Sequence, residues 1–150
     1  EILHALDALA AALDAQGPSL TGLGWDGVRR LRAAGVSLGA HGHHHFPLSR
    51  LPDAELEREI TASVRAVEAE AGTAVTSFAY ANGEAADYDA RAVRLLRGLG
   101  LRCALTTRHG LAQAGDDPFA LPRLYTREPS LALFAARLAG LGAHAPTGVV

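Results

Sequence analysis

Residues 35–45, GVSLGAHGHHH, are the stretch that decides how this chain is interpreted. The apolar, glycine-punctuated run at 36–40 predicts a short β-strand. The histidines that follow it, at positions 41, 43, 44 and 45, therefore lie in the loop at the carboxyl end of that strand. Folds in which strands and helices alternate place their catalytic and ligand-binding groups at this end of the sheet. The stretch thus predicts that this loop carries the chemistry.

His41 and His45 are the two histidines best placed to act together. They are four residues apart, so one helical turn after the strand would put both rings on the same face. Two neutral imidazoles held in this way suit a divalent metal such as zinc. An expression tag does not explain the run, because it is internal and interrupted by Gly42. Two alternatives stay open: solvated loop histidines with adventitious metal affinity, and a pH-sensitive switch.

The composition limits the classes of function. The chain has 150 residues, enough for one domain with a core, and 49% of them are hydrophobic. Its net charge of −2 shows no basic excess, so nucleic acid is not an expected partner. No run approaches the roughly 18 apolar residues of a transmembrane helix, so no membrane span is expected in this stretch. The chain has no methionine and opens at Glu1 inside a helical pattern, which predicts part of a longer or processed product.

Apolar periodicity and turn residues predict alternating helices and strands. Helices are expected over 2–13, around 25–31, over 53–71, from an N-capping Asp87 to Leu99, and from a capping Ser130 to Leu141; strands are expected over 36–40, 75–80, 101–106 and 120–125. Such alternation indicates βαβ units and a parallel sheet, either open or rolled into a barrel. Because the pattern starts with a helix, at least one strand is expected upstream. Residues 1–141 form the predicted domain, and 142–150 a loose tail.

Several short motifs occur in a fixed order along the chain. They are Trp25, Val28, Leu31 and Gly35; GAHGHHH at 39–45; Leu48 and Leu51; Glu59-Ile60 and Ser63; FAYANG at 78–83; Gly100; ALTT at 104–107; and LPRL at 121–124. This order resembles the polysaccharide deacetylases of carbohydrate esterase family 4 over roughly residues 24–125. The most specific part is the H-x-x-x-H element formed by His41 and His45, and the aromatic element after the next strand is second.

The resemblance implies an α/β fold: a partial, distorted (β/α) barrel of the deacetylase type that lacks its first strands. It also implies a divalent metal, zinc above all, with His41 and His45 as two of its ligands. In the family the third ligand is an aspartate beside a second aspartate that acts as the general base. Both belong to a Thr-Phe-Asp-Asp element on the first strand, which would lie upstream of Glu1. The general base is therefore unknown in this chain.

The resemblance also assigns two further residues to the site. The backbone N–H of Asn82 matches the family's donor to the oxyanion, although Asn82-Gly83 also fits an ordinary tight turn. Arg123 lies where the family often has an arginine; it would pair with a catalytic carboxylate, and a surface arginine is the alternative. Two positions depart from the family, because Gly42 replaces a Ser or Thr whose hydroxyl could brace the loop, and Ala81 replaces a Pro.

These expectations combine into one functional hypothesis with alternatives. The hypothesis is a metal-dependent hydrolase that removes acetyl groups from an N- or O-acetylated polysaccharide or oligosaccharide, with this stretch inactive alone because the Asp-Asp element is missing. The first alternative is a non-catalytic remnant that binds carbohydrate or metal without turnover. A truncated barrel that aggregates through its open sheet edges is another. The resemblance favours an envelope or secreted location and leaves the glycan and the oligomeric state undecided.

Overall fold

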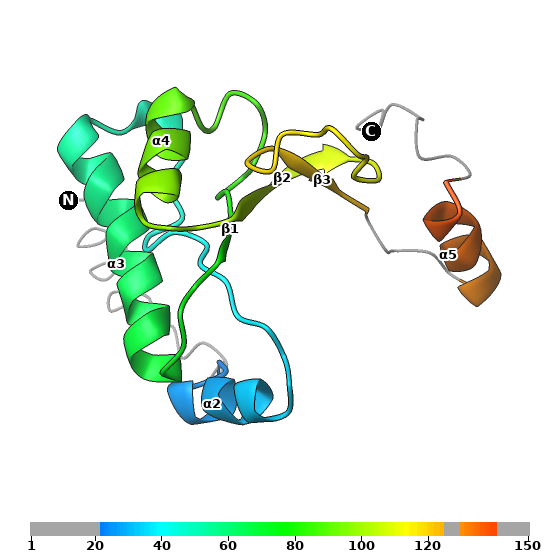
Figure 1. Cartoon of the computed structure of the whole chain (residues 1–150), viewed down its shortest axis with the longest axis horizontal. Coiled ribbons are helices and arrows are strands. Elements are labelled where there is room, and N and C mark those ends of the chain that lie inside the picture. The colour runs from blue at the N-terminus through cyan, green and yellow to red at the C-terminus, as the bar shows by residue number, and fades with distance from the viewer. Residues whose placement is uncertain (1–21, 125–129, 141–150) are drawn as a thin grey trace, which may run out of the picture.

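The computed structural model describes residues 22–124 and 130–140 of the chain (Figure 1). Its elements are α2 (Trp25–Ala33), the 3-10 helix η1 (Leu48–Arg50), α3 (Asp53–Ala71), β1 (Ser77–Ala79), α4 (Ala90–Gly98), β2 (Cys103–His109), β3 (Leu121–Arg123) and α5 (Leu131–Leu138). The predicted helix over 2–13 and the predicted tail at 142–150 lie outside the described residues.

The three strands form one parallel sheet in the order β1-β2-β3. Phe78 of β1 pairs with Ala104 of β2, and Leu105 of β2 pairs with Leu121 of β3. Helix α4 connects β1 to β2, which is the crossover that parallel neighbours need. The sheet and its helical crossover confirm the predicted α/β class with a parallel sheet.

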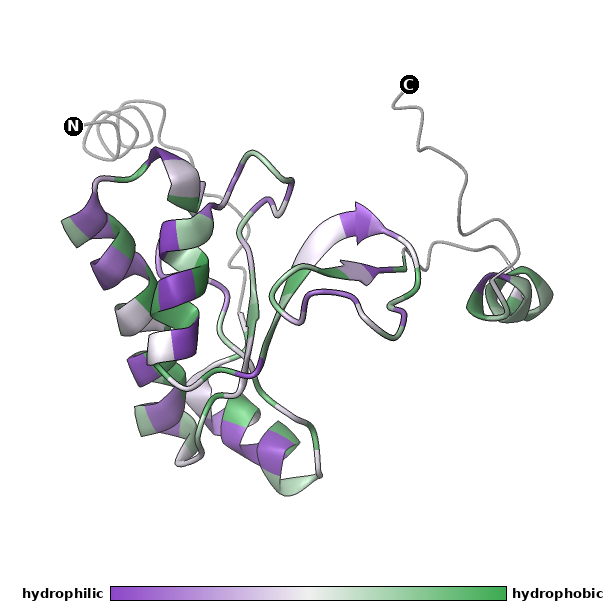
Figure 2. Ribbon diagram, turned by 45° about the horizontal axis from the view of Figure 1, so that its top comes forward, coloured by the Kyte–Doolittle hydropathy of each residue, from purple (hydrophilic) through white to green (hydrophobic). Residues whose placement is uncertain are grey.

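The core lies between the sheet and the helices α3 and α4. Leu56, Ile60 and Val64 recur every four residues along α3, so one face of the helix is apolar and buried. This face packs in one cluster with Phe78, Tyr80, Ala92, Leu96 and Ala104. Figures 1 and 2 show α3 and α4 side by side, each carrying both apolar and polar residues. The predicted bounds of α3 are confirmed, and the helix ends at Gly72, whose φ of 62° is left-handed.

The predicted strand over 36–40 is wrong for all but its last residue. Ala40 alone pairs with Phe78, in a parallel bridge. Its N–H donates to Ser77 O at 3.1 Å, and its carbonyl oxygen accepts from Ala79 N at 2.9 Å. Residues 36–39 form no ladder of backbone hydrogen bonds with β1. Val36 is 47% exposed. A short apolar run does not by itself predict pairing, because pairing also needs a neighbouring strand in register.

Three other predicted boundaries are corrected. Asp89, not Asp87, caps α4: its carboxylate accepts from the N–H groups of Arg91 and Ala92. Asp87 instead closes a turn, because its N–H donates to Glu84 O and its carboxylate accepts from Glu84 N. Strand β2 runs on to residue 109 rather than ending at 106, since its last residues pair with β3. The cap at 130 is confirmed, and α5 ends at 138.

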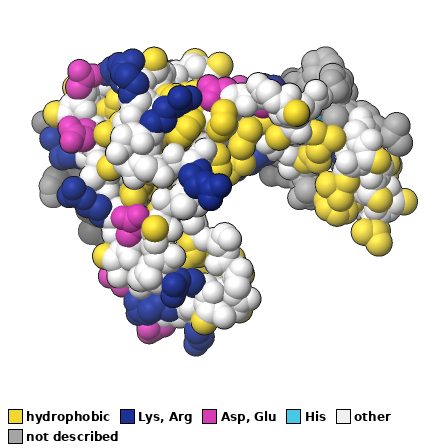
Figure 3. All heavy atoms as spheres, in the orientation of Figure 1, with side chains coloured by type: hydrophobic (Ala, Val, Ile, Leu, Met, Phe, Trp, Pro, Cys, Tyr) yellow, Lys and Arg dark blue, Asp and Glu magenta, His cyan; other side chains and the backbone are white. Residues whose placement is uncertain are grey.

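Helix α5 contributes little to the core. It contains no buried residue, and its leucines lie on the surface, with Leu131 80% exposed and Leu138 52% exposed. Figure 3 shows these apolar side chains grouped at one end of the molecule. Despite this apolar surface, none of the helices in the described part of the chain is both long and apolar enough to cross a membrane.

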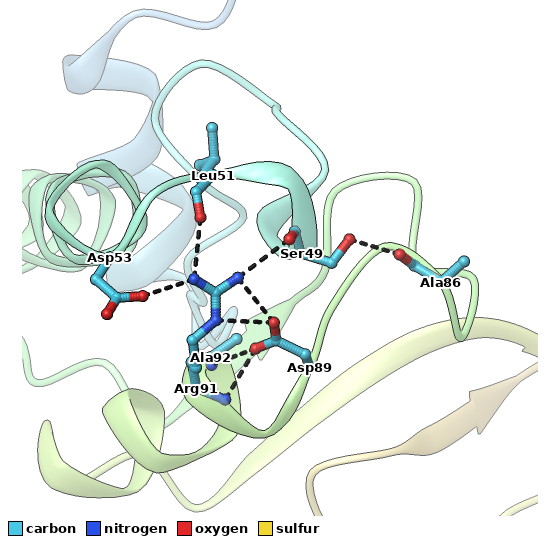
Figure 4. A network of polar contacts seen from close by, with 7 residues as sticks. All are labelled: Ser49, Leu51, Asp53, Ala86, Asp89, Arg91 and Ala92. Atoms are coloured by element: carbon cyan, nitrogen blue, oxygen red, sulfur yellow. Dashed lines mark hydrogen bonds and ion pairs between the residues drawn. The ribbon is translucent and has the colours of Figure 1, made fainter.

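Arg91 joins three elements through one guanidinium group (Figure 4). Its Nη1 donates to Leu51 O at 3.1 Å and to Asp53 Oδ1 at 2.6 Å, and its Nη2 donates to Ser49 O at 3.0 Å. Its Nε donates to the capping carboxylate of Asp89 at 2.9 Å. The group thus holds η1 and the start of α3 against the start of α4. Since η1 follows the histidine loop, the network also fixes where that loop ends.

Replacing Arg91 with Lys is expected to lower the free energy of unfolding, because one ammonium group cannot reach all four acceptors of the planar guanidinium. Urea titration followed by circular dichroism measures the change. Arg94→Lys, on the exposed side of the same helix, is the matched control and should stay within about 0.5 kcal/mol of the parent chain. Equal losses in both variants would show that the network does not stabilise the fold.

Candidate functional site

The four residues predicted to form the site lie at one edge of the sheet. His41 directly follows Ala40, which pairs with β1, and Asn82 comes three residues after β1 ends. Arg123 is the last residue of β3. Because the strands are parallel, their carboxyl ends share this edge, which is where open α/β sheets bind ligands. The topology therefore places the predicted residues on the functional side of the fold.

The rings of His41 and His45 lie against one another. Their centroids are 4.8 Å apart, and the ring planes are at 81°. The expected helical turn is wrong, since residues 41–47 form an irregular loop. Left-handed backbone at Gly42 (φ 87°) and His45 (φ 64°) turns the chain back on itself and brings the rings together instead. Both histidines are exposed. Their role as metal ligands stays a prediction.

The ring of His41 is held in one tautomer by the end of β1. Its Nδ1 lies 2.8 Å from Ala79 O. A carbonyl oxygen can only accept, so in this hydrogen bond Nδ1 carries the proton and Nε2 of the neutral ring keeps its lone pair. Metal-binding histidines are commonly fixed in this way, by a hydrogen bond from the ring nitrogen that does not bind the metal.

The main chain of the loop is held by the carboxylate of Glu59, on α3. Its Oε1 accepts from the N–H groups of His43 at 2.8 Å, His44 at 2.6 Å and His45 at 3.0 Å. Its Oε2 accepts from His44 Nδ1 at 3.0 Å. Burial raises the pKa of the Glu59 carboxyl, but the hydrogen bonds from His44 and His43 outweigh it, so the pKa lies below its usual value. Glu59 is therefore an ionised, buried anchor for the loop.

His43 and His44 form a second pair of neighbouring rings in the loop. Their rings are 4.4 Å apart, and the ring of His44 stacks on Phe46 at 5.6 Å. Together with residues of α3 these three side chains line a cavity of about 500 Å³. None of the four predicted site residues lines this cavity. Of the two histidine pairs in the loop, one therefore lines this cavity and the other does not.

Asn82 has the backbone geometry of a constrained site residue. Its φ is 61°, and it and His45 are the two non-glycine residues with positive φ among those the structure describes. Such conformations cost free energy and are found disproportionately at functional sites. Within the described residues, the Asn82 N–H has no hydrogen-bond acceptor. The next residue, Gly83, has φ 79°, and a Cβ there would lie 2.9 Å from Thr107 N. The turn is tight, and the N–H of Asn82, which is an exposed residue, can donate to a ligand.

Arg123 lies on the exposed side of β3. Its Nε donates to Thr106 O at 2.6 Å, which holds the guanidinium beside β2. No carboxylate pairs with it in the part of the chain that the structure describes. Its predicted carboxylate partner is therefore not supplied by these residues, and the assignment stays a prediction.

The donor set at the loop fits part of a metal site. Two imidazoles lie together, and one of them has its second nitrogen engaged by a carbonyl oxygen, which is the usual support for a ligand. Within residues 22–124 and 130–140, however, no three His, Cys, Asp or Glu side chains come close enough to hold a metal ion. Catalytic zinc usually has three protein ligands. Further ligands would have to come from outside the described residues.

Glu59 is the residue that reasoning from sequence missed as a site residue. It was noted only as part of a family motif, although it is 4% exposed and organises the whole loop. The sequence did carry a signal: an acid falls on the buried face of a predicted helix, between Leu56 and Ser63. A buried carboxylate requires several donors, so such an acid indicates a polar partner across the core.

Comparison with known proteins gives a family and a set of similar folds. A sequence profile of the family described as "Polysaccharide deacetylase" matches residues 7–104. Deacetylase PplD from Streptococcus pyogenes, solved in complex with acetate, is 20% identical with a TM-score of 0.65 and covers 71% of this chain and 46% of its own. IcaB from Ammonifex degensii is 21% identical with a TM-score of 0.62, at 81% and 53% coverage. No curated protein matches the chain in sequence.

A third similar structure is BC0361, a polysaccharide deacetylase from Bacillus cereus, which is 22% identical with a TM-score of 0.58. It covers 71% of this chain and 33% of its own. At such identities the likeness shows the fold alone, and it confirms the predicted fold class as part of a deacetylase-type α/β fold. The chain spans about half or less of the length of these structures.

The tautomer of His41 is directly measurable. Two-bond ¹H–¹⁵N correlation spectra of the metal-free chain at alkaline pH should show Nδ1 protonated and Nε2 unprotonated, because Nδ1 donates to Ala79 O. Free histidine prefers the opposite tautomer, and the exposed ring of His43 serves as the internal comparison. A protonated Nε2 at His41 would remove the support proposed for its metal-binding nitrogen.

The stability of the fold should depend on the ionisation of Glu59. Its folded-state pKa lies below the ordinary value of 4.5, so the stabilisation is complete above that pH and is lost as the pH falls through the folded-state pKa. As the pH falls below about 4.5, the free energy of unfolding should therefore decrease more steeply in the parent chain than in Glu59→Gln. Parallel profiles for the two proteins would contradict this role.

Proposed function

Since the chain belongs to the polysaccharide deacetylase family, we propose that the protein carrying it uses a divalent metal, most simply zinc, to remove acetyl groups from an N- or O-acetylated polysaccharide or oligosaccharide. The observation that carries the metal dependence is the paired placement of His41 and His45, with centroids 4.8 Å apart at the carboxyl edge of the sheet. Family membership supports the reaction, and the ring pair supports the metal.

The chemistry needs an activated water, a stabilised oxyanion and a proton for the leaving group. A bound divalent metal would lower the pKa of a water molecule and polarise the carbonyl oxygen. His41 and His45 would hold it, His41 through Nε2 because its Nδ1 donates to Ala79. The N–H of Asn82 would donate to the oxyanion, since it is exposed and has no acceptor among the described residues. The left-handed turn at Asn82 keeps this N–H in place without reorganisation.

The general base and the third ligand must be supplied from outside the described residues. No acidic side chain joins the ring pair within the part of the chain that the structure describes. The family resemblance puts both groups on an Asp-Asp element ahead of the matched motifs. Arg123 would pair with one of these carboxylates. Without the base the rate would fall by about 10²-fold or more, so the described residues alone are expected to be inactive.

The ring pair can be tested by metal binding alone. His41→Ala and His45→Ala should each weaken zinc binding by more than about 100-fold, because each removes a ligand rather than a supporting contact. Isothermal titration calorimetry on the full chain measures the affinity. His43→Ala, in the same loop, is the control. It should keep the parent affinity, since the His43 ring lines a cavity that neither His41 nor His45 lines. Equal weakening by all three variants would point to adventitious binding.

One observation favours a second candidate, a module that binds metal or glycan without turnover. The described residues bring together two potential ligands and no third. The test is acetate release from acetylated oligosaccharides by the zinc-loaded protein, compared with its His41→Ala variant. Release that depends on His41 supports the deacetylase, and zinc binding without release supports the module. For either candidate we propose a location in the envelope or outside the cell, because the family's usual substrates lie there.

A further inference from the structure

The carboxylate of Glu59 sits where three successive main-chain N–H groups converge. It is 4% exposed, and one of its oxygens accepts from residues 43, 44 and 45 at 2.6–3.0 Å. Successive N–H groups that turn toward one point form a small anion-binding concavity, usually filled by a ligand such as phosphate. Here a side chain of the protein itself fills it. Hydrogen bonds of this charge-assisted kind are about twice as strong as neutral ones.

We propose that Glu59 is a positioning residue for the His41–His45 pair, and that Gly42 is the residue that allows its carboxylate to reach the loop. The inference rests on the proposed function, because it assigns Glu59 a part in metal binding. It adds a residue from α3, a helix that contributes no ligand.

His41 and His45 are held in place by different contacts. His41 is held through its ring, whose Nδ1 donates to Ala79 O. Among the described residues, no hydrogen bond holds the ring of His45, which lies against the ring of His41; its main chain is held, because the N–H donates to Glu59 at 3.0 Å. The left-handed φ of His45 is one that the chain would leave if this hydrogen bond were lost. The spacing of the rings therefore depends on Glu59.

Gly42 and Glu59 are complementary in shape. A Cβ at Gly42 would lie 3.0 Å from Glu59 Oε1, and the φ of 87° is strained for any other residue. A hydroxyl-bearing residue at this position, as the resemblance leads one to expect, would crowd the carboxylate. The glycine removes one brace of the loop, and the buried carboxylate supplies another. The departure at Gly42 is thereby accounted for.

The direct test is the effect of Glu59 variants on the loop and on zinc. In the metal-free full chain, hydrogen exchange by NMR should show protected amides at residues 43–45, and Glu59→Ala should lose this protection. Zinc affinity should fall about 10–100-fold in Glu59→Ala, which is the usual effect of removing a group that orients a ligand. The zinc affinity of Glu59→Gln should fall less, because the amide oxygen of glutamine can still accept from the three N–H groups.

Two controls separate positioning from general loss of stability. Glu57→Gln changes an exposed acid on the same helix and should leave zinc affinity unchanged. Ile60→Val loosens the core beside Glu59 without removing a hydrogen bond to the loop, so it should lower stability and leave the zinc affinity and the absorption spectrum of the cobalt-substituted chain as they are. Glu59→Ala should change that spectrum, because it alters the placement of the ligands. If Ile60→Val changed the zinc affinity and the cobalt spectrum as much as Glu59→Ala does, the proposal would be overturned.

The coupling of Gly42 and Glu59 gives an independent check. Gly42→Ala should weaken zinc binding in the parent chain, and it should weaken it less in the Glu59→Ala background, where the crowding at Oε1 is gone. Additive effects would contradict the complementarity. The proposal fails if the amides of 43–45 exchange equally with and without Glu59, or if affinity is unchanged. The proposed function fails separately, if His41→Ala and His45→Ala leave zinc affinity intact while the Glu59-dependent protection persists.

Discussion

The buried carboxylate of Glu59 is the interaction on which the site depends. An ionised carboxyl inside a protein costs several kcal/mol unless donors replace its water. Four donors from the histidine loop do so, three from the main chain and one from the ring of His44. Because the cost and its compensation come from different segments, α3 and the loop must assume their positions together.

The core sets where that carboxylate lies. Leu56 and Ile60, on either side of Glu59 along α3, are buried against β1 and α4. The acid is thus delivered to the loop by hydrophobic packing, which is non-directional, and is then held by hydrogen bonds, which are directional. Arg91 adds a second restraint at the far end of the loop, through its contacts to η1 and the first turn of α3. The loop is therefore fixed at its start, along its length and at its end.

The sequence predicts well those elements that neighbouring residues determine, and predicts poorly those that depend on contacts with distant parts of the chain. Helix α3 was predicted with its bounds, because its apolar stripe and Gly72 are local signals, and the parallel sheet followed from the alternation of elements. The strand over 36–40 was wrong, because pairing depends on a partner that the run itself does not reveal. The helical turn at His41–His45 was wrong because the loop follows the carboxylate of Glu59, fourteen residues on, rather than its own propensity. Asp89 was missed as the cap of α4 because Asp87 is an equally suitable capping residue in the sequence. The structure shows that the Asp87 carboxylate is used in the turn with Glu84, which leaves Asp89 as the cap.

We propose that His41 and His45 form the protein's part of a metal site at the carboxyl edge of the sheet. The most direct measurement is a crystal structure of the zinc-loaded protein with anomalous data collected at the zinc edge. We expect one anomalous peak bonded to Nε2 of His41 and to the ring of His45, with zinc–nitrogen distances of about 2.0–2.1 Å. A peak at His43 and His44, or none at the ring pair, would contradict it.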